Sequence, residues 1–146
     1  MGARRTARER ALQALYGMEM SRAKAEDALE QAWVSASQDP DAKKDADQDP
    51  AAKKFALELV DGVSAHLEEI DKLLQDHSHN WRLDRMSRID RNVLRLAVFE
   101  LKYRPDIPRK VTLNEAIELG KNFGNEESSS FINGLLDRIA VALNKA

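Results

Sequence analysis

The chain has 146 residues, which is the size of one ordinary domain with a buried core. Its composition is 42% hydrophobic, 33% charged and only 5% aromatic, which favours helices, and the lack of cysteine excludes disulfides, zinc–thiolate sites and cysteine nucleophiles. The net charge of −2 excludes a uniformly polycationic protein, so an argument for nucleic-acid binding must rest on local clusters of Lys and Arg.

Two helices are predicted at the start of the chain. The first covers about residues 4–20, with an apolar stripe centred between Ala7 and Ala11, and the second covers about 24–37. Residues 38–50 contain two Asp-Pro pairs and no large apolar side chain. This segment is therefore expected to be a mobile surface loop.

A long third helix is predicted over residues 51–76, because apolar side chains recur there at steps of three or four: Phe55, Leu59, Val63, Leu67, Ile70 and Leu74. The fourth helix is predicted over about 88–103. Ser87 and Asp90 resemble a capping box at its start, and two prolines follow its end.

Two more helices complete the prediction. The fifth begins at a capping box of Thr112 and Glu115 and runs to Phe123, with Gly124 expected in the left-handed conformation. The sixth runs from about residue 127 or 128 to 143. No strand pattern is present, so the fold class is predicted as all-α, with about six to seven helices.

The chain offers little for catalysis. It has three histidines, and neither a metal-binding helix motif nor a glycine-rich nucleotide loop is present. We therefore expect no cofactor, no metal and no enzymatic activity. No apolar run is long enough to span a membrane and no secretory signal follows the basic N-terminus, so a cytoplasmic location is expected.

Arginines on the first helix are candidates for nucleic-acid binding. On a helical wheel, Arg5 and Tyr16 share one flank of the apolar stripe, and Arg8 lies between the flank and the stripe. Guanidinium groups bind phosphates and an exposed aromatic ring stacks on unpaired bases, which is what single-stranded RNA requires. An ordinary solvated arm, with Tyr16 half buried in a helix contact, is the open alternative.

The fourth helix has a second basic surface opposite its apolar stripe, formed by Arg88, Arg91, Arg95 and Lys102. This basic ridge is expected to meet a polyanion or an acidic protein, or else to be an ordinary solvated face. Asp90 and Glu100 fall towards the apolar side and are expected to be paired. On the sixth helix, Phe131 lies at the edge of the stripe, where it is either available for stacking or part of the core.

Four segments in register resemble the NusB family of transcription antitermination factors. They are RRTARERALQALY (4–16), IDRNVLRLAVFEL (89–101), IPRKVTLNEAIELGKNFG (107–124) and SSSFINGLLD (128–137). The resemblance runs in order over residues 4–137 and leaves only 38–50 without a counterpart. It implies two packed helical subdomains, expected at 1–80 and 81–146.

The resemblance also implies a function and a set of site residues. NusB proteins bind the single-stranded boxA element of nascent RNA together with NusE, a small-subunit ribosomal protein, and act on elongating RNA polymerase, notably in ribosomal RNA operons of bacteria. Family positions for RNA contact match Arg4, Arg5, Arg8, Tyr16, Arg95, Lys121, Glu127 and Phe131. Asp90, with Arg91 beside it, matches the region that meets the protein partner.

Two departures and two alternatives accompany this prediction. Thr6 interrupts the arginine run that many members carry, and a carboxylate at Glu127 repels phosphate. The main alternative is a protein–protein or homodimerisation module that does not itself bind RNA. The second alternative is an appendage of an RNA cytosine methyltransferase, although no cofactor-binding domain is expected in this sequence.

Overall fold

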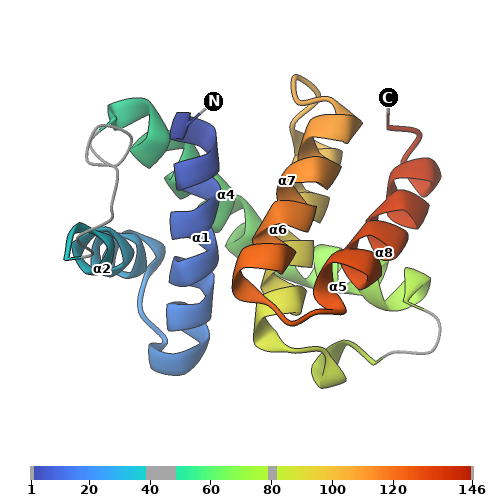
Figure 1. Cartoon of the computed structure of the whole chain (residues 1–146), viewed down its shortest axis with the longest axis horizontal. Helices are drawn as coiled ribbons and strands as arrows, with labels where there is room; N and C mark the ends of the chain where they lie inside the picture. The colour runs from blue at the N-terminus through green and yellow to red at the C-terminus, as the bar shows by residue number, and fades with distance from the viewer. Residues whose placement is uncertain (1, 39–48, 79–81, 146) are drawn as a thin grey trace. The chain divides into compact units, whose positions relative to one another are not determined.

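The structure, a computed structural model, describes residues 2–38, 49–78 and 82–145. Over these ranges it has seven α-helices and one short 3₁₀ turn and no strand, which confirms the predicted all-α fold class (Figure 1). Most of the predicted loop 38–50 lies outside the described residues. No helix in the described ranges is both long enough and apolar enough to cross a bilayer.

The chain divides into two compact units, Met1–Gly62 and Val63–Ala146. The sequence suggested a division between residues 80 and 81. The boundary in the structure lies earlier because helix α5 (Leu67–His77) packs against α6 and α8 and so belongs to the second unit.

The first unit is built from α1 (Gly2–Ser21), α2 (Ala25–Ser37) and most of α4 (Pro50–Ala65). Helices α1 and α2 pack closely, because the facing side chains of α1 are mostly small, and the predicted stripe of α1 is buried at Ala7, Ala11, Ala14 and Leu15. Helix α4 begins with Pro50 at its first position, and the Asp49 carboxylate accepts a hydrogen bond from the Ala51 amide at 2.9 Å. This cap fixes where α4 starts.

The predicted long third helix is wrong in one respect: it is two helices, α4 and α5, separated at His66. The backbone of His66 leaves the helical region (φ −117°, ψ 22°), and its ring stacks on Tyr103 with centroids 4.2 Å apart. Leu67 is consequently 38% exposed, although it was placed in the buried stripe. The helix is thus interrupted at His66 itself, which is neither proline nor glycine, and the stacking on Tyr103 accompanies the break.

Helix α6 (Arg88–Tyr103) is the centre of the second unit, with α5, α7 (Arg109–Phe123) and α8 (Ser128–Ala142) packed against it. The Ser87 hydroxyl accepts a hydrogen bond from the Asp90 amide at 3.1 Å, so the predicted N-terminal cap and both ends of this helix are confirmed. The 3₁₀ turn Leu83–Arg85 precedes it.

The predicted start of the fifth helix is wrong, because α7 begins at Arg109, one turn earlier. Thr112 does not cap the helix; it is buried and its hydroxyl donates to the Glu100 carboxylate at 3.0 Å. Glu100, only 2% exposed, is thus paired as expected, with a threonine as one partner. A buried carboxylate needs such a donor, and this takes precedence over local capping.

Candidate nucleic-acid interface

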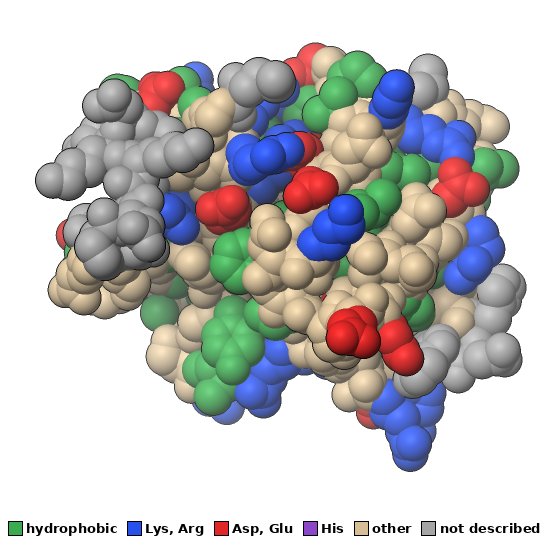
Figure 2. Space-filling view, viewed as in Figure 1, with side chains coloured by type: hydrophobic (Ala, Val, Ile, Leu, Met, Phe, Trp, Pro, Cys, Tyr) green, Lys and Arg blue, Asp and Glu red, His purple; other side chains and the backbone are tan. Residues whose placement is uncertain are grey.

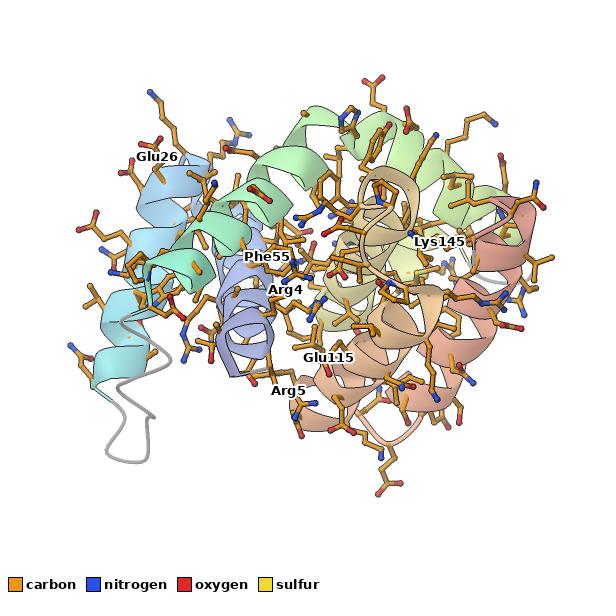
Figure 3. The ribbon with its side chains drawn as sticks, turned by 90° about the horizontal axis from the view of Figure 1, so that it is seen from above. Arg4, Arg5, Glu26, Phe55, Glu115 and Lys145 are labelled. Atoms are coloured by element: carbon orange, nitrogen blue, oxygen red, sulfur yellow. The ribbon has the colours of Figure 1, made fainter. Side chains whose placement is uncertain are left out.

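The three arginines predicted to form the RNA arm differ in their surroundings. Arg4 and Arg5 are exposed, whereas Arg8 is only 4% exposed. The guanidinium carbons of Arg4 and Arg8 lie 5.0 and 5.3 Å from the ring centroid of Phe55 on α4, which places both in cation–π range. Figure 3 shows Arg4 beside Phe55. Phe55 therefore anchors the arm to the first unit.

Tyr16 lies three turns after Arg5 on the same side of α1, and it is 40% exposed. Along an α-helix this separation is about 16 Å. Leu12, between them on the wheel, is 1% exposed and secures this flank to the core. The α1 flank thus presents a guanidinium and a partly exposed aromatic ring, while Arg8 is covered and contributes to packing against Phe55.

The basic ridge of α6 is largely neutralised within its own unit. Arg95 donates from Nε to Asp71 Oδ1 at 2.8 Å and from an Nη atom to Asp71 Oδ2 at 2.9 Å. Lys102 lies 2.8 Å from Glu69 Oε1. At these two positions α5 supplies the acidic partners, so an external polyanion would have to compete with Asp71 and Glu69 for these cations.

Glu69 also accepts a hydrogen bond from the Tyr103 hydroxyl. The hydrogen bonds from Lys102 and Tyr103 lower the pKa of Glu69 below its ordinary value. The same bond to Glu69 raises the pKa of Tyr103, because it stabilises the protonated phenol. This cluster ties the end of α6 to the start of α5.

Asp90, predicted to face the protein partner, is 8% exposed. Its Oδ1 atom is buried and accepts no hydrogen bond from any described residue, and Asn92 Nδ2 nearby in sequence is likewise buried without an acceptor. Asp90 was expected to be paired, and over the described residues this is wrong. Because burying a polar atom without a partner costs about 1–3 kcal/mol, these two atoms are a local cost to the stability of α6.

The turn between α7 and α8 is held by side-chain hydrogen bonds. Asn125 Oδ1 accepts from the Glu127 amide at 2.9 Å and the Ser128 hydroxyl at 3.3 Å, while Ser128 Oγ accepts from the Asn125 amide at 3.0 Å. Gly124 is extended (φ −97°, ψ −160°), so the predicted left-handed conformation is wrong. Its glycine is needed for space, because a Cβ there would lie 2.8 Å from the Gly120 carbonyl oxygen.

This turn positions the three candidate RNA residues of the second unit. Lys121, with 60% of its side chain exposed, lies in the last turn of α7. Glu127 is exposed and occupies the N-cap position of α8. Phe131 follows within the first turn of α8, at intermediate exposure. A cation, a carboxylate and an aromatic ring are thus held by one tight connection.

The surface charge is mixed. Figure 2 shows Lys and Arg side chains interspersed with acidic and hydrophobic ones on the face it presents. Among the described residues, no group of His, Asp and Glu side chains is arranged to hold a metal ion. Any attraction of a polyanion must come from local groups such as the α1 arm.

Sequence patterns did not reveal the roles of four residues on which this arrangement depends: Phe55, Asp71, Asn125 and Ser128. Phe55 and Asp71 act through contacts between helices, which a single-helix wheel does not contain. The Asn125–Ser128 pair had a local signal, since an Asx turn at the start of a helix is a known role of asparagine.

The comparisons identify the family. The model of the NusB family matches residues 5–141. The transcription antitermination protein NusB of Myxococcus xanthus (strain DK1622) is 70% identical over 149 residues, covering 99% of both chains. The structure of T. maritima NusB has a TM-score of 0.79 at 40% identity, covering 94% of this chain and 90% of that one.

A second solved structure contains the antitermination factors NusB and NusE in complex with dsRNA. Its matching chain has a TM-score of 0.82 at 26% identity, with 97% of this chain and 98% of that chain covered. Together with the family match over almost the whole sequence, these likenesses confirm the resemblance seen in the four motifs. The chain belongs to the NusB family and is a transcription antitermination factor, not an enzyme.

Proposed function

We propose that this chain binds single-stranded boxA RNA together with NusE, and that the complex acts on elongating RNA polymerase in the bacterial cytoplasm, notably in ribosomal RNA operons. The observation that carries the proposal is the α1 flank, where Arg5 and the 40% exposed Tyr16 lie on one side of a helix. This flank offers both interactions that unpaired RNA needs, phosphate pairing and base stacking.

The second unit supports a further set of contacts. Lys121 supplies a phosphate contact and Phe131 a stacking surface, and the Asn125–Ser128 hydrogen bonds hold both in place. Arg95 is also a candidate for RNA contact. To bind a phosphate, its guanidinium must either contact Asp71 and the phosphate together or break its ion pair with Asp71. The Glu127 carboxylate repels the RNA phosphates, so it limits the affinity for the RNA backbone. It is better suited to accept a hydrogen bond from a base amino group.

Asp90 and Arg91 are proposed to meet NusE. The support for this placement is the resemblance to the family, in which Asp90 matches an acidic position near the protein partner. A related NusB chain is found in complex with NusE and RNA, at 26% identity and a TM-score of 0.82. That assembly supports the choice of partner.

The deciding experiment is a fluorescence-anisotropy titration of labelled boxA RNA, with and without NusE, at two salt concentrations. Scrambled RNA of equal length and composition is the control. We expect selective binding of boxA that tightens with NusE and weakens as salt rises, because phosphate contacts release counterions.

Equal affinity for boxA and scrambled RNA in the presence of NusE would overturn the proposal. Sedimentation analysis of the same samples tests the alternative. A stable homodimer that does not dissociate on adding RNA and NusE would favour a homodimerisation module in which the arginine arm is covered.

A further inference from the structure

A groove lies between α2 and α4 in the first unit, on helices that carry none of the proposed RNA-binding residues. It has a volume of about 320 Å³ and is lined by Glu26, Leu29, Glu30, Trp33, Lys53 and Leu57. The α2 residues are spaced by three and four, and the α4 residues by four, so each helix presents one continuous face. This size is at the lower end of protein ligand pockets and suits one or two side chains.

The floor of the groove is apolar and contains an aromatic anchor. Leu29 is 6% exposed, and Trp33 and Leu57 are of intermediate exposure. The Lys53 ammonium lies 6.0 Å from the centroid of the Trp33 ring, which is at the limit of cation–π range and links the α4 wall to Trp33. Tryptophan in a groove of this kind is the residue type most enriched at the energetic centres of protein interfaces.

The α2 wall is acidic. Glu26 and Glu30 are one helical turn apart and exposed, and neither makes an ion pair or side-chain hydrogen bond with any described residue. Figure 3 shows Glu26 pointing outward from the start of α2. Because carboxylates repel phosphate, this rim disfavours RNA, and it favours a cationic group on the α2 side of the groove, opposite Lys53.

We propose that this groove docks an amphipathic helical segment of a partner protein, with an apolar side chain seated on Trp33 and two Lys or Arg residues, one turn apart, facing Glu26 and Glu30. Apolar anchoring gives affinity in such helix-in-groove contacts, and the flanking charges select the partner and its direction. The site is separate from the proposed RNA surface and does not depend on it.

The test uses Trp33 as the reporter. The full chain with Trp81→Phe has Trp33 as its one tryptophan. Its emission is followed while a short amphipathic Lys/Leu peptide is added, and a matched Glu/Leu peptide serves as the charge control. We expect a saturable change in Trp33 emission with the basic peptide and none with the acidic one.

Charge reversal then tests the rim. The double substitution Glu26→Lys with Glu30→Lys is expected to weaken binding of the basic peptide about tenfold or more. Asp27→Lys with Glu68→Lys changes the net charge equally at exposed residues outside the groove and is expected to keep most of the affinity. Circular dichroism confirms that both variants fold.

Three results would overturn the proposal. Equal weakening by the two double variants would show that only overall charge matters. Binding of the basic peptide only after deletion of residues 41–48 would show that this chain fills its own groove. Concentration-dependent self-association that is lost in Trp33→Ala, with no peptide binding, would identify a second copy as the occupant.

Discussion

Arg95 and Asp71 form a two-pronged ion pair between α6 and α5, with N–O distances of 2.8 and 2.9 Å. Their side chains are only 13% and 24% exposed, so the pair is more protected from solvent than a surface salt bridge. This pairing means that the same guanidinium cannot serve the fold and an RNA phosphate at full strength. The competition between the two roles is measurable.

Asp71→Asn is expected to lower the free energy of unfolding by about 1–3 kcal/mol, because charged hydrogen bonds are lost. It is also expected to tighten boxA binding, because Arg95 is released towards RNA. Urea denaturation and RNA anisotropy measure the two effects. Asp76→Asn, which removes an exposed pair with Lys72, is the control and should change neither by much. Unchanged RNA affinity in Asp71→Asn would assign Arg95 to the fold alone.

Arg5→Ala and Arg8→Ala are expected to separate binding from stability. Arg8 is 4% exposed and lies over Phe55, so its loss should lower the free energy of unfolding by about 1–2 kcal/mol. Arg5 is exposed, so its loss should lower the free energy of unfolding less than the loss of Arg8 does, and it should reduce the salt dependence of RNA binding. Thermal melts and salt titrations distinguish the variants; the reverse pattern would contradict this assignment of roles.

Tyr16→Ala and Phe131→Ala are each expected to weaken binding of boxA RNA by about 1–3 kcal/mol, the worth of stacking one base on an aromatic ring. Val141→Ala removes an apolar side chain that is 60% exposed on α8 and serves as the control. Anisotropy titrations measure the affinities, and circular dichroism checks the fold. If both aromatic variants fold and bind as the parent does, neither ring stacks on RNA.

Gly124→Ala is expected to destabilise the second unit by about 1–3 kcal/mol. The new Cβ would lie 2.8 Å from the Gly120 carbonyl oxygen, which cannot move without disturbing α7. Gly134→Ala is the matched control, because the nearest atom to its Cβ is 3.8 Å away, and alanine there should stabilise α8 by about 0.5–1 kcal/mol. Chemical denaturation of both variants decides the matter; a neutral Gly124→Ala would mean that the turn adapts.

Tyr103 is expected to ionise above the ordinary tyrosine pKa, because its hydroxyl donates to Glu69. Its raised pKa gives stability that is fully present below the unfolded value of 10.0 and is lost as pH rises through the folded value. Tyr16→Phe leaves Tyr103 as the one tyrosine, so tyrosinate absorbance reports it directly. Glu69→Gln on this background should lower the midpoint, and an unchanged midpoint would exclude the hydrogen bond as the cause.

Glu69 has the opposite dependence. Its lowered pKa gives stability that is present above the ordinary value of 4.5 and is lost as pH falls through the folded value. Thermal melts between neutral and acidic pH should therefore show a smaller loss of stability in Glu69→Gln than in the parent. Equal losses would mean that other carboxylates dominate the acid transition.

The sequence was most informative where a signal was local. The Ser87 cap and the apolar stripe of α6 predicted both ends of that helix correctly. Thr112 shows the limit, since the same capping pattern occurs inside α7, where the hydroxyl serves buried Glu100 instead. Whether such a threonine caps its own helix or hydrogen-bonds to a buried side chain depends on the neighbouring helix. The local sequence pattern carries no information about that neighbour.

The same limit applies to the candidate site. A helical wheel placed Arg5 and Tyr16 on one exposed flank, but it gave Arg8 the same role although Phe55 covers it. It grouped the cations of α6 correctly yet missed Asp71, 24 residues earlier, which pairs with one of them. Charge patterns describe one helix at a time, whereas neutralisation is decided by its neighbours.

The stacking of Arg4 and Arg8 on one ring, Phe55, couples the chemistry of the arm to the integrity of the first unit. A phosphate that draws Arg4 away from the ring must replace an attraction of about 0.5–1 kcal/mol. Each gain in binding at the arm is then offset in part by looser anchoring of α1 to α4. Ligand affinity and thermal stability of this chain are therefore not independent quantities, and a substitution at Phe55 should alter both together.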